Sequence, residues 1–121
     1  MIRYINCIRK NADISLEEFR EYWCGPEYKE LLDKVASYYQ ATRYSRNLTL
    51  KVGMADRLIS DRGLGEPYDG TIEFYWENAQ PLSALYDSPQ AQTLAEQINK
   101  FQSVFIDLSR STAFFTESET D

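Results

Sequence analysis

The chain has 121 residues, of which 43% are hydrophobic and 26% are charged. This length and composition fit one globular domain with a single core. The net charge is −6, and without a basic patch the chain is a poor match for nucleic acid or for an anionic membrane surface. The sequence contains no histidine, which excludes Ser-His-Asp and Cys-His triads and histidine-ligated zinc or haem iron in this chain. Acid–base chemistry would therefore depend on Asp, Glu, Tyr, Lys or Cys.

No segment has the pattern of a targeting or membrane sequence. No apolar run is long enough to cross a bilayer, and residues 1–4 do not form the charged start of a secretory signal. Cys7 and Cys24 fall in different expected elements and have no metal-type spacing. We therefore expect two free, reduced thiols. Together these features favour a cytoplasmic protein.

The first half of the chain predicts a strand, an interrupted helix and a second strand. Residues 2–8 are mostly apolar and favour a strand. Ser15 and Glu18 form a capping box at the start of a helical apolar pattern, which Gly25-Pro26 interrupts and which resumes to about residue 35. Residues 38–50, rich in Tyr and Thr, predict the second strand.

The second half opens with a segment that has no clear pattern. Residues 52–68 contain three glycines and a proline and are interpreted as a long loop, a length typical of functional covers and partner arms. The remaining elements are a third strand, two helices and a final strand, expected at 71–76, at 78–86, from Ser88-Pro89 to about 102, and at 111–116.

This order of elements predicts an α+β fold, a ferredoxin-like βαββαβ domain with an antiparallel sheet. We assign residues 1–116 to a single domain and residues 117–121 to a flexible acidic tail. Helices on one side of a sheet leave its other face bare. If that face is apolar, a second copy is its simplest cover, and we expect a homodimer whose sheets enclose a pocket for a small, largely apolar ligand.

Alternation along the third strand points to Glu73 as a candidate catalytic residue. Ile72, Phe74 and Trp76 form the apolar set that should face the helices, so Glu73 and Tyr75 face the other way. A carboxylate in an apolar pocket suits a general acid or base. The alternative is a structural ion pair with Arg3, Arg43 or Arg46.

Asn6 and Trp23 are candidate ligand contacts in other elements. Asn6 lies among the more apolar side chains of the first strand and must form hydrogen bonds, either to a ligand or within a bulge. Trp23 could line a pocket, but its place on the apolar stripe of a helix favours the core.

Three segments resemble conserved parts of one protein family. Residues 15–23, SLEEFREYW, are similar to the opening helix of EthD-domain proteins, residues 69–76 to their third strand, and residues 105–117 to their closing segment. The resemblance implies a dimeric α+β barrel whose two sheets pack face to face, with a cavity in each subunit and without a metal or organic cofactor. Relatives include polyketide cyclases, a muconolactone isomerase, dehydratases, decarboxylases and accessory proteins.

The resemblance also suggests roles for individual residues. Arg43-Tyr44 resembles an Arg-Tyr pair of the family, which implies a pocket hydroxyl on Tyr44; the alternative is a packed ring whose hydroxyl bonds to backbone. Glu27 stands where many members have a histidine, so it is either a replacement for that group or an exposed residue at a helix break.

The sequence leaves three interpretations open. The first is a cofactor-independent lyase, isomerase or cyclase in which Glu73 transfers protons while Tyr44 and an arginine such as Arg43 stabilise enolate charge. Asn6, Tyr75, Trp23 and Glu27 would complete its substrate site. The second is a non-catalytic small-molecule carrier or accessory protein. A purely structural dimer with a filled barrel is a third possibility.

Overall fold

The computed structural model describes residues 1–119. Its centre is a four-stranded antiparallel sheet with strand order β2-β3-β1-β4. The strands are β1 (Ile2–Ile8), β2 (Arg43–Leu48), β3 (Gly70–Trp76) and β4 (Thr112–Glu117). The predicted α+β, ferredoxin-like fold is confirmed.

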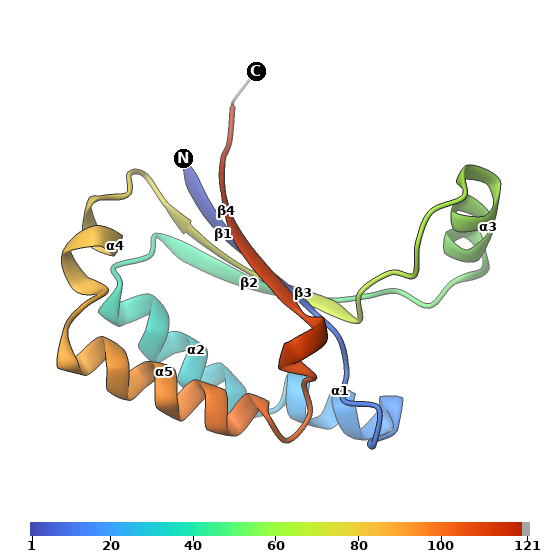
Figure 1. Ribbon diagram of the computed structural model, residues 1–121, viewed down its shortest axis with the longest axis horizontal. Helices are drawn as coiled ribbons and strands as arrows, with labels where there is room; N and C mark the ends of the chain where they lie inside the picture. The colour runs from blue at the N-terminus through green and yellow to red at the C-terminus, as the bar shows by residue number, and fades with distance from the viewer. Residues whose placement is uncertain (120–121) are drawn as a thin grey trace.

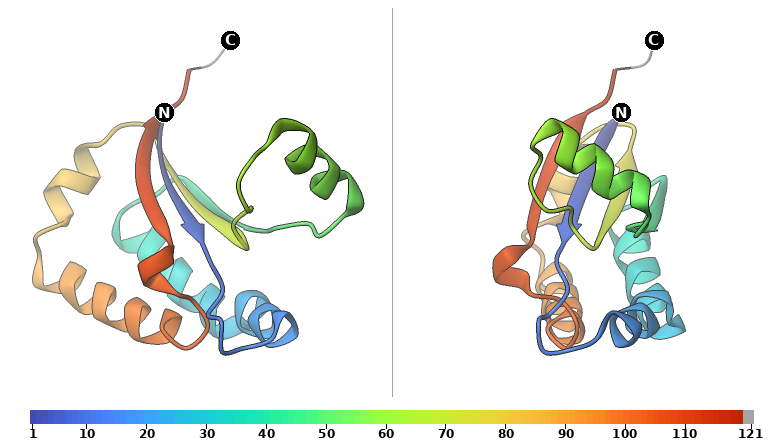
Figure 2. Two further views of the ribbon diagram at one scale, coloured as in Figure 1. Left: turned by 45° about the vertical axis from the view of Figure 1, so that its right-hand side comes forward. Right: turned by 90° about the vertical axis from the view of Figure 1, so that its right-hand side faces the viewer.

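The helices lie mainly on one face of this sheet (Figure 1). They are α1 (Leu16–Cys24), α2 (Pro26–Tyr38), α4 (Gln80–Leu85) and α5 (Pro89–Gln102), followed by the short 3-10 helix η1 (Leu108–Arg110). One further helix, α3 (Gly53–Arg62), stands apart from this layer, on the other side of the sheet (Figure 2). The part of the chain that the structure describes contains no helix long and apolar enough to span a membrane.

Local sequence signals explain where the main helices begin. Ser15 Oγ accepts a hydrogen bond from the Glu18 amide at 3.1 Å, which caps α1. Pro26 occupies the first position of α2, where its missing N–H costs no helical hydrogen bond. Ser88 caps α5 in the same way as Ser15 caps α1, with its Oγ 3.0 Å from the Ala91 amide.

The core lies between the sheet and the helices. Ile72, Phe74 and Trp76 of β3 face the helices, as the alternation predicted, and all three are buried. They pack with a cluster of rings and aliphatic side chains from the helices and the segment after α5: Phe19, Trp23, Tyr28, Leu32, Phe105 and Ile106. Trp23 is 2% exposed, so the alternative that placed it in the core fits the structure.

The elements differ from those expected in two places, at the boundary between α2 and β2 and in the segment after β2. The α2 helix continues to Tyr38, and Gln40, with φ of 58°, turns the chain before β2 begins at Arg43. Residues 38–42 are therefore not part of the second strand. The segment 52–68, interpreted as a loop, contains the ten-residue helix α3.

The end of the chain is paired further than expected. Strand β4 includes Glu117, and the amide of Ser118 donates to the carbonyl of Met1 at 2.9 Å. The tail assigned to 117–121 thus begins with residues bonded along β1, while 120–121 lie outside the described residues.

Candidate functional site

A cavity of about 370 Å³ lies between the sheet and the helices of a single chain. Strands β1, β3 and β4 form one wall, and helices α2, α4 and α5 form the other. Most of its surface is apolar, including Leu32, Val35, Phe74, Trp76, Leu94 and Ile98. The cavity is thus on the helical side of the sheet, whereas the sequence analysis expected a pocket between two sheets.

Among the described residues, no charged side chain lines this cavity. The polar groups along it are amides and hydroxyls, from Asn6, Asn99, Gln102, Ser111 and the phenols of Tyr4, Tyr39 and Tyr86. Such a surface can offer directed hydrogen bonds to a neutral molecule. It has no counter-charge for an ion.

Burial changes the acidity of two phenols in this lining. Burial raises the pKa of Tyr4, and the nearby Tyr86 phenol adds to the effect. Burial likewise raises the pKa of Tyr39, with further contributions from Tyr38 and Tyr86. An ordinary phenol, with a pKa of about 10, is already protonated at neutral pH, so both hydroxyls are available there to donate hydrogen bonds to a ligand oxygen.

Gln102 joins the cavity to the core beneath it. Its side chain is 5% exposed, and its Nε2 donates to the hydroxyl of Tyr28 at 2.8 Å. Burial raises the pKa of Tyr28 strongly. This pair supplies the hydrogen bond that a buried amide requires, and it fixes the orientation of Gln102 at the cavity wall.

The exposed lining residues mark the entrance. Tyr86 is 72% exposed and Phe115 is 57% exposed, whereas Ile72 of the sheet wall and Leu32 of the helical wall are each 1% exposed. A ligand would therefore enter between the end of α4 and strand β4. Tyr38 holds the turn that precedes α5, since its hydroxyl donates to the carbonyl of Leu85 at 2.9 Å.

The other face of the sheet, called here the open face, is mainly polar. The strand register places Arg3, Ile5, Cys7, Arg43, Ser45, Asn47, Thr71, Glu73, Tyr75, Thr112, Phe114 and Thr116 on it. The condition under which the sequence analysis expected a homodimer, an apolar face, is therefore met only in part. Ile5, Tyr75 and Phe114 are its large apolar side chains, of which Tyr75 is buried and Phe114 is exposed, and charged and hydroxyl groups surround them.

Glu73 is paired on this open face. Arg3 donates to its Oε1, and Asn47 Nδ2 donates to its Oε2 at 3.1 Å. The ring of Tyr75 lies between Arg3 and Arg43, with guanidinium carbons 5.1 and 3.9 Å from its centroid. This arrangement matches the structural ion pair that the sequence offered as the alternative role for Glu73.

The model of the EthD domain family matches residues 11–109, which is most of the chain. The chain belongs to the EthD domain family. The match runs from the turn before α1 into η1, so it includes the helical wall of the cavity and strands β2 and β3.

Solved structures share the fold over almost the whole length of this EthD domain. A protein of the ethyl tert-butyl ether D family from Bacillus halodurans is 13% identical, with a TM-score of 0.61, and the match covers 98% of this chain and 99% of the other. A dimeric ferredoxin-like protein of unknown function from Bacteroides fragilis is 11% identical, with a TM-score of 0.60 and coverage of 97% and 95%. Hydroxynitrile lyase from Passiflora edulis is 14% identical, with a TM-score of 0.59 and coverage of 99% and 95%. At these identities the similarity shows the fold alone. No protein of curated function matches the sequence.

The residues singled out from the sequence do not form one site in this EthD domain. Asn6 lines the cavity. Glu73, Arg43 and Tyr75 lie on the open face, while Tyr44 lies on the helical face, stacked on Phe74. Trp23 is in the core, and Glu27 is exposed in the first turn of α2.

The alternative role for Tyr44 was a packed ring whose hydroxyl bonds to backbone. In the structure the ring is packed, but the hydroxyl bonds to a side chain. The Tyr44 hydroxyl donates to Asp33 Oδ1 at 2.5 Å. Burial, together with the bond to Asp33 and the charge of that carboxylate, raises the pKa of Tyr44 to about 12. Tyr44 does not line the cavity.

Sequence reasoning missed most of the polar residues that line the cavity, among them Tyr4, Tyr39, Tyr86 and Gln102. One signal was present, because Gln102 continues the apolar period of its helix and a polar residue on such a stripe needs a buried partner. Tyr39 had been assigned to a strand, so its direction was not predicted. Within residues 1–119, no three Cys, Asp or Glu side chains are close enough to bind a metal ion.

Proposed function

We propose that this EthD-domain protein binds a small, neutral, largely apolar molecule in the cavity between its sheet and its helices. The observation that supports the proposal is the lining, which is apolar apart from amides and hydroxyls and has no charged side chain. An ion that entered would lose hydration without gaining a counter-charge. The volume of about 370 Å³ is at the lower end of the range of small-molecule sites.

The second candidate function is cofactor-independent catalysis on such a molecule, of the lyase, isomerase or cyclase type. The phenols of Tyr4 and Tyr39 favour it, because protonated hydroxyls can stabilise negative charge that develops on a substrate oxygen. The fold is shared with hydroxynitrile lyase from Passiflora edulis, which supports the proposal by analogy of fold. Proton transfer by Glu73 would instead require a substrate on the open face, since Glu73 does not line the cavity.

We also propose that the protein is a homodimer formed through the open face. The similar protein from Bacteroides fragilis is dimeric, and a sheet covered by helices on one side only has a second face free for contact. Phe114 is 46% exposed there, on edge strand β4. The polar residues that surround it favour an interface held by paired hydrogen bonds as well as by apolar contact.

Two related fluorophores test whether the cavity binds neutral molecules. N-phenyl-1-naphthylamine is neutral, and 1-anilinonaphthalene-8-sulfonate has the same ring system with a sulfonate. We expect the neutral probe to bind at least tenfold more tightly, by fluorescence titration. Equal affinity would contradict the proposal.

A pair of substitutions localises the binding. Ala95 lines the cavity, whereas Ala84 is exposed on α4 and does not. Ala95→Phe should fill the cavity and weaken binding of the neutral probe at least tenfold, and Ala84→Phe should leave it unchanged. If both variants bind like the wild type, the probe occupies another site and the proposal fails.

Catalysis and simple binding are separated by the fate of the natural ligand. Small molecules released from the purified, denatured protein are identified by mass spectrometry and returned to fresh protein. Recovery of the same molecule unchanged supports a carrier. Conversion to an isomer, or to two fragments, supports the isomerase or lyase reaction, and a fivefold or greater loss of rate in Tyr4→Phe would place the chemistry in the cavity.

A further inference from the structure

One part of the chain has no role in the cavity or in the core. Residues 49–68, called here the arm, connect β2 to β3 and contain α3. In a shorter connection these strands would form a simple hairpin, since the Thr49 amide donates to the Asp69 carbonyl at 3.0 Å. The arm is therefore an insertion at the end of a complete strand pair.

The arm extends away from the body of its own chain. It stands on the side of the sheet opposite to α2, α4 and α5, and the left view of Figure 2 shows α3 separated from the strands. None of the residues of α3 is buried. A helix of ten residues is marginal in water unless it packs against something, and α3 meets its own chain only on the side that faces its flanking segments. Its outer side is therefore free to contact a partner.

The exposed side of α3 is apolar enough to form such a contact. Met54 is 80% exposed and Leu58 is 51% exposed, and a spacing of four residues places them on one side of the helix. Ala55 and Ile59 line the hollow between α3 and its flanking segments. The outer pair, Met54 and Leu58, is left without a partner within the described chain.

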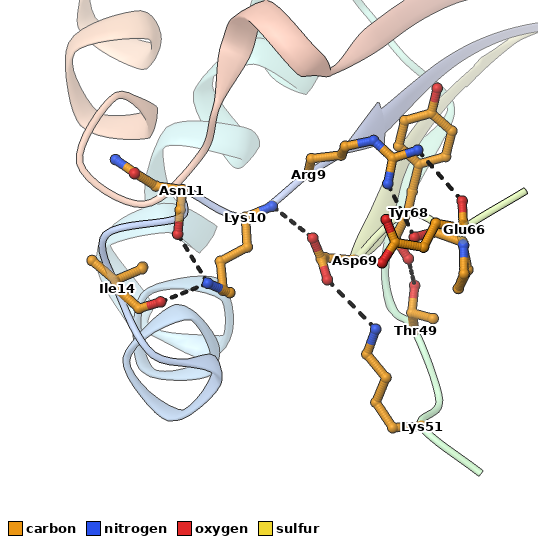
Figure 3. Close-up of polar contacts among 10 residues, drawn as sticks. Arg9, Lys10, Asn11, Ile14, Thr49, Lys51, Glu66, Tyr68 and Asp69 are labelled. Carbon is orange, nitrogen blue, oxygen red and sulfur yellow. Dashed lines mark hydrogen bonds and ion pairs between the residues drawn. The ribbon is translucent and has the colours of Figure 1, made fainter. Parts of the chain in front are cut away.

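The base of the arm is held firmly enough to present this surface in one direction (Figure 3). The guanidinium of Arg9 lies 4.2 Å from the ring centroid of Tyr68, and its Nη1 donates to the carbonyl of Pro67 at 3.2 Å. On the other segment, Thr49 Oγ1 donates to the carbonyl of Tyr68 at 2.6 Å, and Lys51 pairs with Asp69 at 3.5 Å. These bonds tie both ends of the arm to each other and to β1.

The charge of the arm is compatible with a second copy of this chain as the partner. Each copy has a net charge of −6, so contact between copies is opposed by repulsion unless it uses a neutral surface. The arm has three basic and three acidic side chains, Lys51, Arg57, Arg62, Asp56, Asp61 and Glu66. It therefore carries no net charge, and Arg57 and Asp61 are paired within it at 3.8 Å.

We propose that the arm clasps a second copy of the chain, with Met54 and Leu58 packed against the partner that occupies the open face. In a dimer with two-fold symmetry both copies use the same patch. The contact would therefore occur twice, with the arm of each copy packed against the other copy. The inference rests on the proposed homodimer and goes beyond it by assigning the segment that secures it.

The test compares dimer dissociation constants by sedimentation equilibrium. Met54→Asp/Leu58→Asp alters the outer side of α3, and Leu16→Asp/Val104→Asp adds the same charge at two exposed apolar positions outside the arm. We expect the arm variant to dissociate at least tenfold more readily than the wild type. The control should change by less than threefold.

A shortened chain provides an independent test in case the double variant misfolds. Joining Thr49 to Asp69 through Asn-Gly removes the arm and closes β2 and β3 with a two-residue turn. It should fold, by circular dichroism, and dissociate at least tenfold more readily than the wild type. Unchanged dissociation in the shortened chain overturns the role of the arm but leaves the dimer standing, whereas a monomeric wild type overturns both.

Discussion

Glu73 and Tyr44 lie on neighbouring strands, yet their side chains are on opposite faces of the sheet. Ser45, the residue after Tyr44, is the one that pairs with Glu73. Tyr44 stacks on Phe74 under the helices, and Glu73 bonds to Arg3 on the open face. One reaction cannot use both groups, so the cavity and the ion pair can be tested separately.

Glu73→Gln is expected to affect stability and not binding in the cavity. The substitution removes the charge opposite Arg3 and should lower the free energy of unfolding by about 1 kcal/mol, since the pair is partly exposed. Binding of N-phenyl-1-naphthylamine should stay within twofold of the wild type. Urea denaturation and fluorescence titration measure the two effects.

Glu77→Gln is the matched control, because Glu77 is exposed just beyond β3. It should change neither stability nor binding. A tenfold loss of probe affinity in Glu73→Gln alone would show that the probe occupies the open face.

Periodicity and capping signals explain why most of the fold was predictable. Alternation in β3 assigns Ile72 and Glu73 to opposite faces whatever lies beyond each face. Ser15 and Ser88 mark helix starts because their hydroxyls cap amides three residues later. These are local signals, and the structure agrees with each of them.

The location of the cavity was not predictable in the same way. Alternation predicts which side chains share a face of the sheet, but it does not predict whether the helices fill the space above that face. How well this space is filled depends on the sizes of side chains such as Ala91 and Ala95, which come from α5, far away in the sequence. Helix α3 was missed for a local reason. It begins after Val52, which provides no side-chain cap.

The contact between Gly70 and Trp23 is expected to be sensitive to one methyl group. A Cβ at Gly70 would lie 2.8 Å from the Trp23 ring and 3.0 Å from the Asn47 carbonyl. Gly70→Ala should therefore destabilise the protein by about 1–3 kcal/mol through overpacking. Thermal and urea unfolding measure the change.

Gly65 provides the comparison, since a Cβ there would meet nothing within 4 Å. Gly65→Ala should change stability by about 0.5 kcal/mol or less. Equal effects at the two positions would indicate that the Trp23 ring moves aside at no cost, contrary to the tight packing described for the core.

The buried pair of Tyr28 and Gln102 is expected to show strong coupling. Tyr28→Phe leaves Gln102 Nε2 without its acceptor in a buried site and should cost about 1–3 kcal/mol. Adding Gln102→Leu removes the unpaired amide and should recover part of the loss. A double-mutant cycle by urea denaturation measures the coupling free energy, and additive effects would refute a shared hydrogen bond.

Alkaline unfolding is expected to report on Tyr44. Burial and the carboxylate of Asp33 raise its pKa to about 12, above the value of about 10 in an unfolded chain. A raised pKa favours the protonated folded state, so the contribution is complete below about pH 10 and disappears as the pH rises to about 12. Wild-type stability should therefore fall more steeply than that of Tyr44→Phe over this interval.

Asp33→Asn separates the two causes of this shift. It keeps the Tyr44 ring buried but removes the carboxylate, so its stability should fall less steeply than that of the wild type and more steeply than that of Tyr44→Phe. Urea midpoints measured at several pH values from 8 to about 12 give the three slopes. Equal slopes for the wild type and Asp33→Asn, both steeper than that of Tyr44→Phe, would mean that the hydrogen bond of 2.5 Å between Tyr44 and Asp33 does not persist in solution, because an ionising phenol bonded to a carboxylate must lose that bond.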